Sequence, residues 1–226
     1  MRLFWWNTVP NLGDVLTKML LEHGGEQVEF APVSSAEWVG IGSVLELFFD
    51  SRATIFGTGR AGPSAPPTNL RKARVLALRG TATRALTFSD AEVLGDPGLL
   101  VTDLQERWDG DYTAIVPHWQ DVPRLRALYP DATIVDVTGD PKAALLVLAG
   151  AGRIISSSLH GVVFADAYGI PRCWDPSPTT QAKGFKFRDY GTVVGAFEPM
   201  EWHTADPGLI ERVKGDLRGC LTSPSA

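Results

Sequence analysis

A single histidine stands where this chain could do acid–base chemistry. Ile155 and Ser156 indicate the end of a buried strand, and a small-residue stretch then leads to His160, Gly161 and a helix. This order places a titratable imidazole and the amides of a helix start at the carboxyl end of a strand, where open α/β sheets bind ligands. We therefore expect His160 in a ligand site. The alternative is a histidine that only hydrogen-bonds a nearby carbonyl group.

Two further ionisable residues occupy comparable positions. Asp14 stands in the first turn of an expected helix, where its carboxylate either interacts favourably with the helix dipole or accepts a proton from a hydroxyl group. Arg79 follows a strand, and its planar guanidinium suits bidentate binding of a carboxylate or a phosphate. An arginine at a strand end is otherwise usually in a surface ion pair, so we do not expect Arg79 in the core.

Glycine-containing turns follow three successive expected strands in the first half of the chain. Asn11 and Gly13 fit a tight loop whose backbone approaches a ligand, or only turn chemistry. Gly57 and Gly59 either admit a phosphate or only relieve a strand end. The repetition of such turns indicates a ligand edge more strongly than any one glycine does.

In the second half, His118 follows a strand on the expected cleft side and is a candidate for substrate binding. Trp119 stands beside it. Aromatic faces stack on sugar rings, although most tryptophans fill or cover cores.

Strand-like and helix-like segments alternate through most of the chain, which favours an α/β architecture with a mainly parallel sheet. The expected strands are 2–6, 38–41, 53–56, 75–78, 112–116, 132–137, 153–156 and 171–174. The expected helices are 14–23, 81–88, 122–129, 141–149, 161–168 and 207–217.

The polar segment 102–111 is the best candidate for a linker between two domains. We expect an N-terminal Rossmann-like half at 1–103, a C-terminal Rossmann-like half at 111–200, and a helix with a tail at 201–226. Two small Rossmann-like halves facing a cleft would resemble a compact glycosyltransferase B arrangement.

Composition excludes several classes of protein. The chain has 226 residues and a formal net charge of -5, with no basic run, which argues against nucleic acid as a partner. Cys173 and Cys220 are too few for a disulfide framework or a zinc site. The amino terminus lacks the apolar region of a signal peptide, and no apolar stretch approaches the roughly 18 to 20 residues that span a bilayer. We expect a cytoplasmic protein with reduced thiols.

Several motifs resemble, in order and spacing, those of the polysaccharide pyruvyl transferase family over roughly residues 1–195. They are Asn11-Leu12-Gly13-Asp14, Arg79-Gly80-Thr81-Ala82-Thr83-Arg84, Leu94-Gly95-Asp96-Pro97-Gly98-Leu99-Leu100 and Ser158-Leu159-His160-Gly161. Val116-Pro117-His118 and Lys186-Phe187-Arg188-Asp189-Tyr190 also resemble segments of the branch involved in succinoglycan pyruvylation. Single motifs of this kind are not specific, but together they make the resemblance.

The family's enzymes transfer a carboxyethylidene group from phosphoenolpyruvate to two hydroxyls of a sugar, which forms a cyclic ketal and releases phosphate. The resemblance implies this pyruvyltransferase activity on a cell-surface polysaccharide or its precursor. The donor substrate is then phosphoenolpyruvate, with no cofactor and no metal. A lipid-linked oligosaccharide acceptor would bring peripheral membrane contact, and a homo-oligomer is a further expectation.

The resemblance also implies roles for individual residues. His160 falls on the family's active-site histidine and becomes the general acid, Arg79 grips the donor, and Asp14 is the candidate base. The residues expected to bind substrate are Asn11, Gly13, Gly57, Gly59, Arg84, His118, Ser158 and Lys186.

One departure matters. Many relatives carry an arginine immediately before the Leu-His pair, and this chain has Ser158 there. The missing positive charge could come from Arg60, Arg84, His118, Lys186 or Arg188, and Lys186 is our first choice because it stands in an expected loop that also resembles the family. The alternatives are a glycosyltransferase that uses a nucleotide-sugar, or a non-catalytic carbohydrate-binding protein of the same fold.

Overall fold

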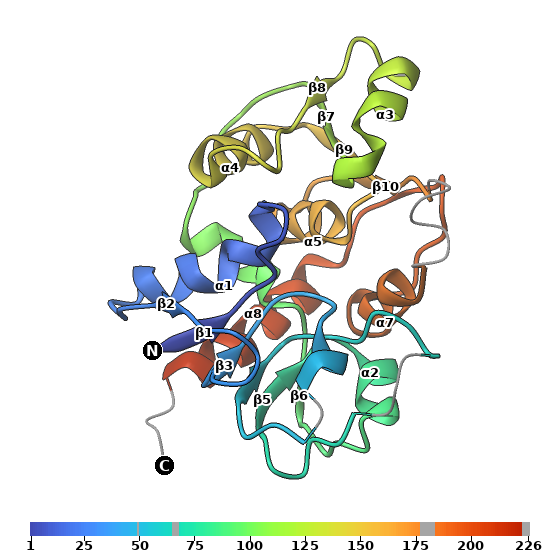
Figure 1. The fold of residues 1–226 in the computed structure, drawn as a ribbon. Helices are drawn as coiled ribbons and strands as arrows, with labels where there is room; N and C mark the ends of the chain where they lie inside the picture. The colour runs from blue at the N-terminus through green and yellow to red at the C-terminus, as the bar shows by residue number, and fades with distance from the viewer. Residues whose placement is uncertain (49, 65–67, 177–183, 223–226) are drawn as a thin grey trace.

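The protein is an α/β structure built on two mainly parallel sheets (Figure 1). The computed structural model describes residues 1–48, 50–64, 68–176 and 184–222. In Figure 1 the strands of the C-terminal sheet lie above those of the N-terminal sheet, with helices α5 and α8 between them. The α/β class expected from the alternating pattern is therefore confirmed.

The N-terminal sheet is parallel throughout, with strand order β2-β1-β3-β4-β5-β6. Its strands are β1 (Arg2–Phe4), β2 (Glu29–Phe30), β3 (Trp38–Val39), β4 (Thr54–Phe56), β5 (Arg74–Leu78) and β6 (Val93–Leu94). Its helices are α1 (Leu12–His23), α2 (Thr81–Leu86) and the 3₁₀ helices η1 (Leu45–Phe48) and η2 (Pro97–Asp103). Strand β2 pairs with one edge of β1, and β3 pairs with the other edge. The strand order therefore reverses between β1 and β3.

The C-terminal sheet has the order β11-β10-β9-β7-β8, and only β11 is antiparallel to its neighbour. Its strands are β7 (Thr113–Val116), β8 (Thr133–Ile134), β9 (Arg153–Ser156), β10 (Arg172–Trp174) and β11 (Trp202–His203). Its helices are η3 (Trp119–Asp121), α3 (Val122–Leu128), α4 (Pro141–Ala149), α5 (Leu159–Tyr168), α7 (Gly184–Val194) and α8 (Pro207–Thr222). The order reverses again, here between β7 and β9.

Local sequence signals explain where several helices begin and end. Asn11 precedes α1 in an extended conformation, and its side chain accepts a hydrogen bond from the Gly13 amide at 2.9 Å. Asp96 caps η2 in the same way, because its side chain accepts a hydrogen bond from the Gly98 amide at 2.9 Å. Gly169 ends α5 with φ of +65°, a conformation that favours glycine.

One hydrophobic core runs through both halves of the chain. It joins residues of α1, η2 and α5 to residues of α8, including Leu217. Helix α8 packs on η2, β5 and β6, and α7 packs on α2. At the end of α8, Arg218 forms an ion pair with Asp103 at 2.6 Å, and the Cys220 thiol lies 3.4 Å from the Leu76 carbonyl oxygen. The last part of the chain thus completes the first half, and the domain boundaries expected from sequence stay a prediction.

Two local expectations differ from the structure. Lys186 was expected in a loop, but it lies in the first turn of α7, an element that the sequence pattern did not indicate. Strands β2, β6 and β11, each of two residues, were not expected from the sequence.

Cys173 and Cys220 are both free thiols. Among the described residues, no helix is long and apolar enough to cross a membrane.

We expect Leu217→Ala to destabilise the whole chain by about 2–5 kcal/mol, because Leu217 is fully buried between the halves and its truncation leaves a cavity. Urea unfolding followed by tryptophan fluorescence measures the change. The control is Leu146→Ala on α4, where the side chain is half-exposed and a change within about 0.5 kcal/mol is expected. A local loss confined to the C-terminal helix, with the N-terminal sheet unaffected, would contradict a shared core.

Candidate functional site

A cavity of about 520 Å³ lies where the two sheets reverse their strand order. Residues that follow β1, β3, β7 and β9 line it, so the carboxyl ends of these four strands meet there. Ligands of open α/β sheets bind at such points. The lining residues are Trp6, Val9, Asn11, Asp14, Ser43, Val44, Glu46, Leu47, Ala61, His118, Trp119, Ser158, Leu159, His160 and Lys186.

His160 is placed by the start of α5 and by the loop before α1. Its ring stacks on Phe164 with centroids 6.1 Å apart. Its Nδ1 side lies so close to Gly13 that a Cβ atom on residue 13 would stand 1.8 Å from Nδ1. Gly13 therefore acts by admitting the imidazole, a role that the sequence did not distinguish from a backbone contact with ligand.

The imidazole of His160 lies in an environment that disfavours its charged form. Burial, and then the positive charges of Lys186 and Arg79, lower its pKa from 6.5 to about 3. Its Nε2 atom is shielded from water and has no hydrogen-bond partner among the described residues. The ring is therefore neutral at pH 7 without a ligand, whereas the sequence suggested an imidazolium. A buried polar atom without a partner is rare and marks a place where a ligand can supply one.

Asp14 lies in the first turn of α1 and faces the same cavity. Burial raises the pKa of its carboxyl group from 3.8 to about 7, against the opposing effect of Lys186. The group therefore exchanges its proton near neutral pH, which is the range in which a general base or acid works best.

Lys186 supplies a positive charge to the cavity from the first turn of α7. Its charge lowers the pKa values of both Asp14 and His160. Among the described residues, no group of three or more histidine, cysteine, aspartate or glutamate side chains could hold a metal ion. The described lining thus includes the ammonium of Lys186, the carboxyl groups of Asp14 and Glu46, and the imidazoles of His118 and His160.

The loop from β9 to α5 is held by serine side chains. The Ser156 hydroxyl lies 2.8 Å from the Val116 carbonyl oxygen and accepts a bond from the Ser158 amide at 3.0 Å. The Ser157 hydroxyl accepts a bond from the His118 amide at 2.8 Å. These bonds fix Ser158 and His118 at the cavity wall, and their expected role in substrate binding stays a prediction. The His118 ring in turn stacks on Trp119, with centroids 5.9 Å apart.

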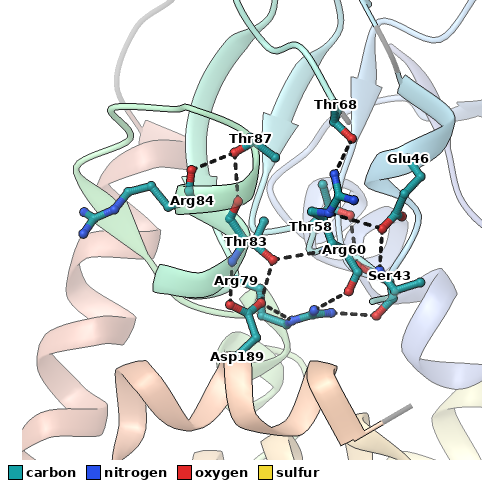
Figure 2. Close-up of polar contacts among 12 residues, drawn as sticks. Ser43, Glu46, Thr58, Arg60, Thr68, Arg79, Thr83, Arg84, Thr87 and Asp189 are labelled. Carbon is teal, nitrogen blue, oxygen red and sulfur yellow. Dashed lines mark hydrogen bonds and ion pairs between the residues drawn. The ribbon is translucent and has the colours of Figure 1, made fainter. Parts of the chain in front are cut away.

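Arg79 does not line the cavity. Its side chain is 0% exposed and donates from Nε to Asp189 Oδ2 at 3.0 Å, as Figure 2 shows. The expectation that a strand-end arginine would stay out of the core is wrong. The partner that makes burial possible, Asp189, lies on a helix 110 residues away in sequence, where no local pattern could indicate it.

Like Gly13, three further expected binding residues lie outside the lining, namely Gly57, Gly59 and Arg84. Gly57 has φ of +71°, and a Cβ there would stand 2.1 Å from Pro97 Cδ. Gly59 gives room to the Arg79 guanidinium, since a Cβ there would stand 2.2 Å from Cζ. Arg84 extends from α2 away from Asp189 (Figure 2). Its Nη1 donates to the Ala91 carbonyl oxygen at 3.4 Å. Within the described part of the chain, these glycines serve close packing.

Sequence reasoning missed several lining residues. Ser43 and Glu46 follow β3, and Trp6 follows β1 and is 43% exposed. Their position just after strand ends is a signal that could have identified them. The signal alone was not sufficient, because the strand order that brings those ends together is not visible in the sequence.

Comparisons with known proteins confirm the family resemblance. Residues 68–174 match the model of the polysaccharide pyruvyl transferase family. The chain is 27% identical over 173 residues to the succinoglycan biosynthesis protein ExoV of Rhizobium meliloti (strain 1021), which covers 70% of this chain and 53% of that protein. It is 34% identical over 118 residues to the uncharacterized protein L143 of Acanthamoeba polyphaga mimivirus, covering 45% of this chain and 40% of that protein.

The chain spans about half the length of the curated relatives it matches. No solved structure matches it significantly, so the resemblance to a glycosyltransferase B arrangement has no structural neighbour behind it.

We expect Asp14→Asn to stabilise the protein, and the gain to grow between pH 4 and pH 7. The carboxyl pKa rises from 3.8 unfolded to about 7 folded, so the folded wild type binds more protons in this range and loses stability as pH rises. The variant escapes this loss, which is on the order of a few kcal/mol. Urea midpoints measured from pH 4 to 8 give the difference.

The control for this prediction is Asp136→Asn, which should lower the free energy of unfolding instead of raising it. Hydrogen bonds from Thr138 and Gly139 lower the pKa of Asp136, so its carboxylate stabilises the fold above pH 4. Removing this carboxylate in the variant should therefore destabilise the protein in that range. A pH-independent difference for Asp14→Asn would show that Asp14 is an ordinary solvated acid.

Proposed function

This chain is related to the polysaccharide pyruvyl transferase family, and we propose that it transfers a carboxyethylidene group from phosphoenolpyruvate to two hydroxyls of a sugar. The acceptor would be a cell-surface polysaccharide or its lipid-linked precursor. One observation carries the proposal: Asp14, His160 and Lys186 converge on a single cavity where both sheets reverse their order. That cavity offers the charge and the proton carriers that this reaction needs.

The reaction sets clear demands on the site. The methylene carbon of the donor gains a proton and becomes a methyl group, while C2 acquires positive character and bonds to two hydroxyl oxygens. The C2–oxygen bond to phosphate breaks. Of the two protons that the hydroxyls lose, one balances the new methyl group and the other leaves with phosphate. A cation, an acid and a base held in place would meet these demands.

Lys186 is the cation for the donor anions. Relatives of this kind carry an arginine where this chain has Ser158, and Lys186 lines the same cavity as Ser158 from another element. An ammonium group binds phosphate as a point charge, whereas an arginine fork binds it with fixed geometry. The substitution therefore keeps the charge while relaxing the orientation of the donor.

His160 is the acid, and binding of the donor raises the pKa of its imidazole. In the empty cavity, burial and the neighbouring cations keep the pKa of His160 at about 3. The phosphate and carboxylate of the donor bring negative charge into the same cavity, which raises the pKa of the ring. Binding of donor is thus coupled to proton uptake, and the proton is then available for the methylene carbon.

Asp14 is the base. A carboxyl group with a pKa of about 7 is partly ionised at neutral pH and accepts a proton far better than one with the usual value of 3.8. Its place at the first turn of α1, opposite His160 across Gly13, puts acid and base on different elements of the same cavity.

The acceptor sugar would enter over the exposed aromatic rings. Trp6 and Trp119 line the cavity, and both are 43% exposed. Half-exposed aromatic faces beside polar groups bind sugar rings well. Trp119 also lines an adjoining groove with Arg126, Asp136 and Thr138, which gives room for a further sugar unit of an oligosaccharide.

The test is phosphate release from phosphoenolpyruvate with a panel of oligosaccharide acceptors. We expect acceptor-dependent release by wild type, loss of at least about 100-fold in kcat for His160→Gln, and a roughly tenfold or greater rise in KM for phosphoenolpyruvate for Lys186→Met. Lys186→Arg should retain most donor binding because it keeps the charge.

Lys142→Met on α4 is the matched control, since Lys142 is an exposed lysine outside the cavity lining, and its kinetics should equal those of wild type. Thermal shifts separate the rival readings. Stabilisation by a nucleotide-sugar but not by phosphoenolpyruvate would favour a glycosyltransferase. Sugar binding without turnover, unchanged in His160→Gln, would favour a binding protein.

A further inference from the structure

Arg79 connects three segments that form walls of the cavity. Its Nε donates to Asp189 on α7 at 3.0 Å, Nη1 to the Ser43 hydroxyl at 2.6 Å, and Nη2 to the Arg60 carbonyl at 2.7 Å (Figure 2). Ser43 itself lines the cavity, and Arg60 immediately precedes Ala61, which also lines it. One guanidinium thus joins the loop after β3, the loop after β4 and helix α7.

Both carboxylate oxygens of Asp189 likewise accept hydrogen bonds from buried groups. Its Oδ1 accepts the Thr83 amide at 2.8 Å, and its Oδ2 accepts the Thr83 hydroxyl at 2.7 Å in addition to Arg79. Both members of the ion pair are 0% exposed. Because the carboxylate is fixed from two sides, the position of α7 relative to β5 and α2 is fixed with it.

The backbones around this pair approach too closely for any other side chain. A Cβ on Gly80 would stand 2.0 Å from the Asp189 carbonyl oxygen, and a Cβ on Gly59 would stand 2.2 Å from Arg79 Cζ. The glycines on both sides thus make the ion pair sterically possible. This explains why glycine-containing turns stand at these two strand ends.

Lys186 precedes Asp189 by three residues on α7, so the two side chains leave the same helix less than one turn apart. We propose that Arg79 is a positioning residue, which holds α7 through Asp189 and so sets where Lys186 meets the donor. The inference rests on the proposed function for the identity of that donor. It replaces the direct grip on donor expected of Arg79 with an action through another residue.

Direct contact between Arg79 and donor does not fit the geometry. Each of its three nitrogens already donates to a protein oxygen, and none of its surface is accessible. A donor molecule in the cavity would have to break the Asp189 pair to reach it, which would leave a buried carboxylate without its partner.

A double-mutant cycle tests the proposal. Arg79→Lys keeps the charge, but one ammonium cannot reach three acceptors in different segments, so α7 should shift. We expect the KM for phosphoenolpyruvate to rise roughly ten- to hundredfold, with a smaller change in kcat. Lys186→Met should produce a similar rise alone, and the double variant should be no worse than Lys186→Met, because both act through the same contact.

Arg172→Lys is the matched control. Arg172 and Asp166 form a second fully buried pair, at 2.7 Å, and neither residue lines the cavity. This variant should lower the melting temperature about as much as Arg79→Lys does, while the KM for phosphoenolpyruvate stays at the wild-type value. A merely structural role for Arg79 predicts equal kinetics in the two variants.

Hydrogen exchange provides a readout that needs no donor. We expect faster exchange of the amides at 184–194 in Arg79→Lys and a smaller change in Arg172→Lys, which reaches α7 through Asp166 and the Tyr190 hydroxyl, 2.9 Å apart. Unchanged exchange of α7, together with effects of Arg79→Lys and Lys186→Met that multiply, would overturn the proposal and return Arg79 to donor contact. If α7 loosens as expected but wild type neither binds nor turns over phosphoenolpyruvate, the proposed function fails while the positioning role stands.

Discussion

The contact between the Arg79 guanidinium and the Asp189 carboxylate is the constraint on which the arrangement of the cavity depends. It is fully buried, and it joins residues 110 positions apart in sequence, one at the end of β5 and one on α7. A buried ion pair adds little net stability, but it tolerates very few geometries, because each charge must keep its partner. The segments that form the cavity walls are therefore held in one arrangement relative to one another. Shape, rather than extra stability, is what such a pair contributes.

The electrostatics of the cavity follow from burial within that frame. Asp14 and His160 are both driven toward their neutral forms, and Lys186 provides the positive charge that remains. An empty site of this kind is costly to the fold and well suited to an anion, because the ligand supplies the charge that the groups lack. The same desolvation that weakens the free protein makes the protonation of both groups sensitive to whether an anion is bound.

Much of this was predictable from local sequence. The main strands and the helices from α1 to α5 follow hydrophobic periodicity and capping residues, and the motif around His160 indicated the sheet edge where the cavity lies. The burial of Arg79 was not predictable, because its partner lies on α7 and only the tertiary fold brings the two together. The pKa of His160 depends likewise on neighbours distant in sequence. Lys186 was chosen for its charge and does line the cavity, but its helix was not expected from the sequence.

Helix α8 has a consequence for how the chain is made. Its residues Val213 and Leu217 cover Gly95 and the core behind β5 and β6, and Cys220 reaches Leu76 across 144 positions in sequence. During synthesis, the first half therefore leaves the ribosome with part of its apolar surface uncovered, and it stays so until the last helix follows. Contacts of such long range fold slowly and expose intermediates to aggregation.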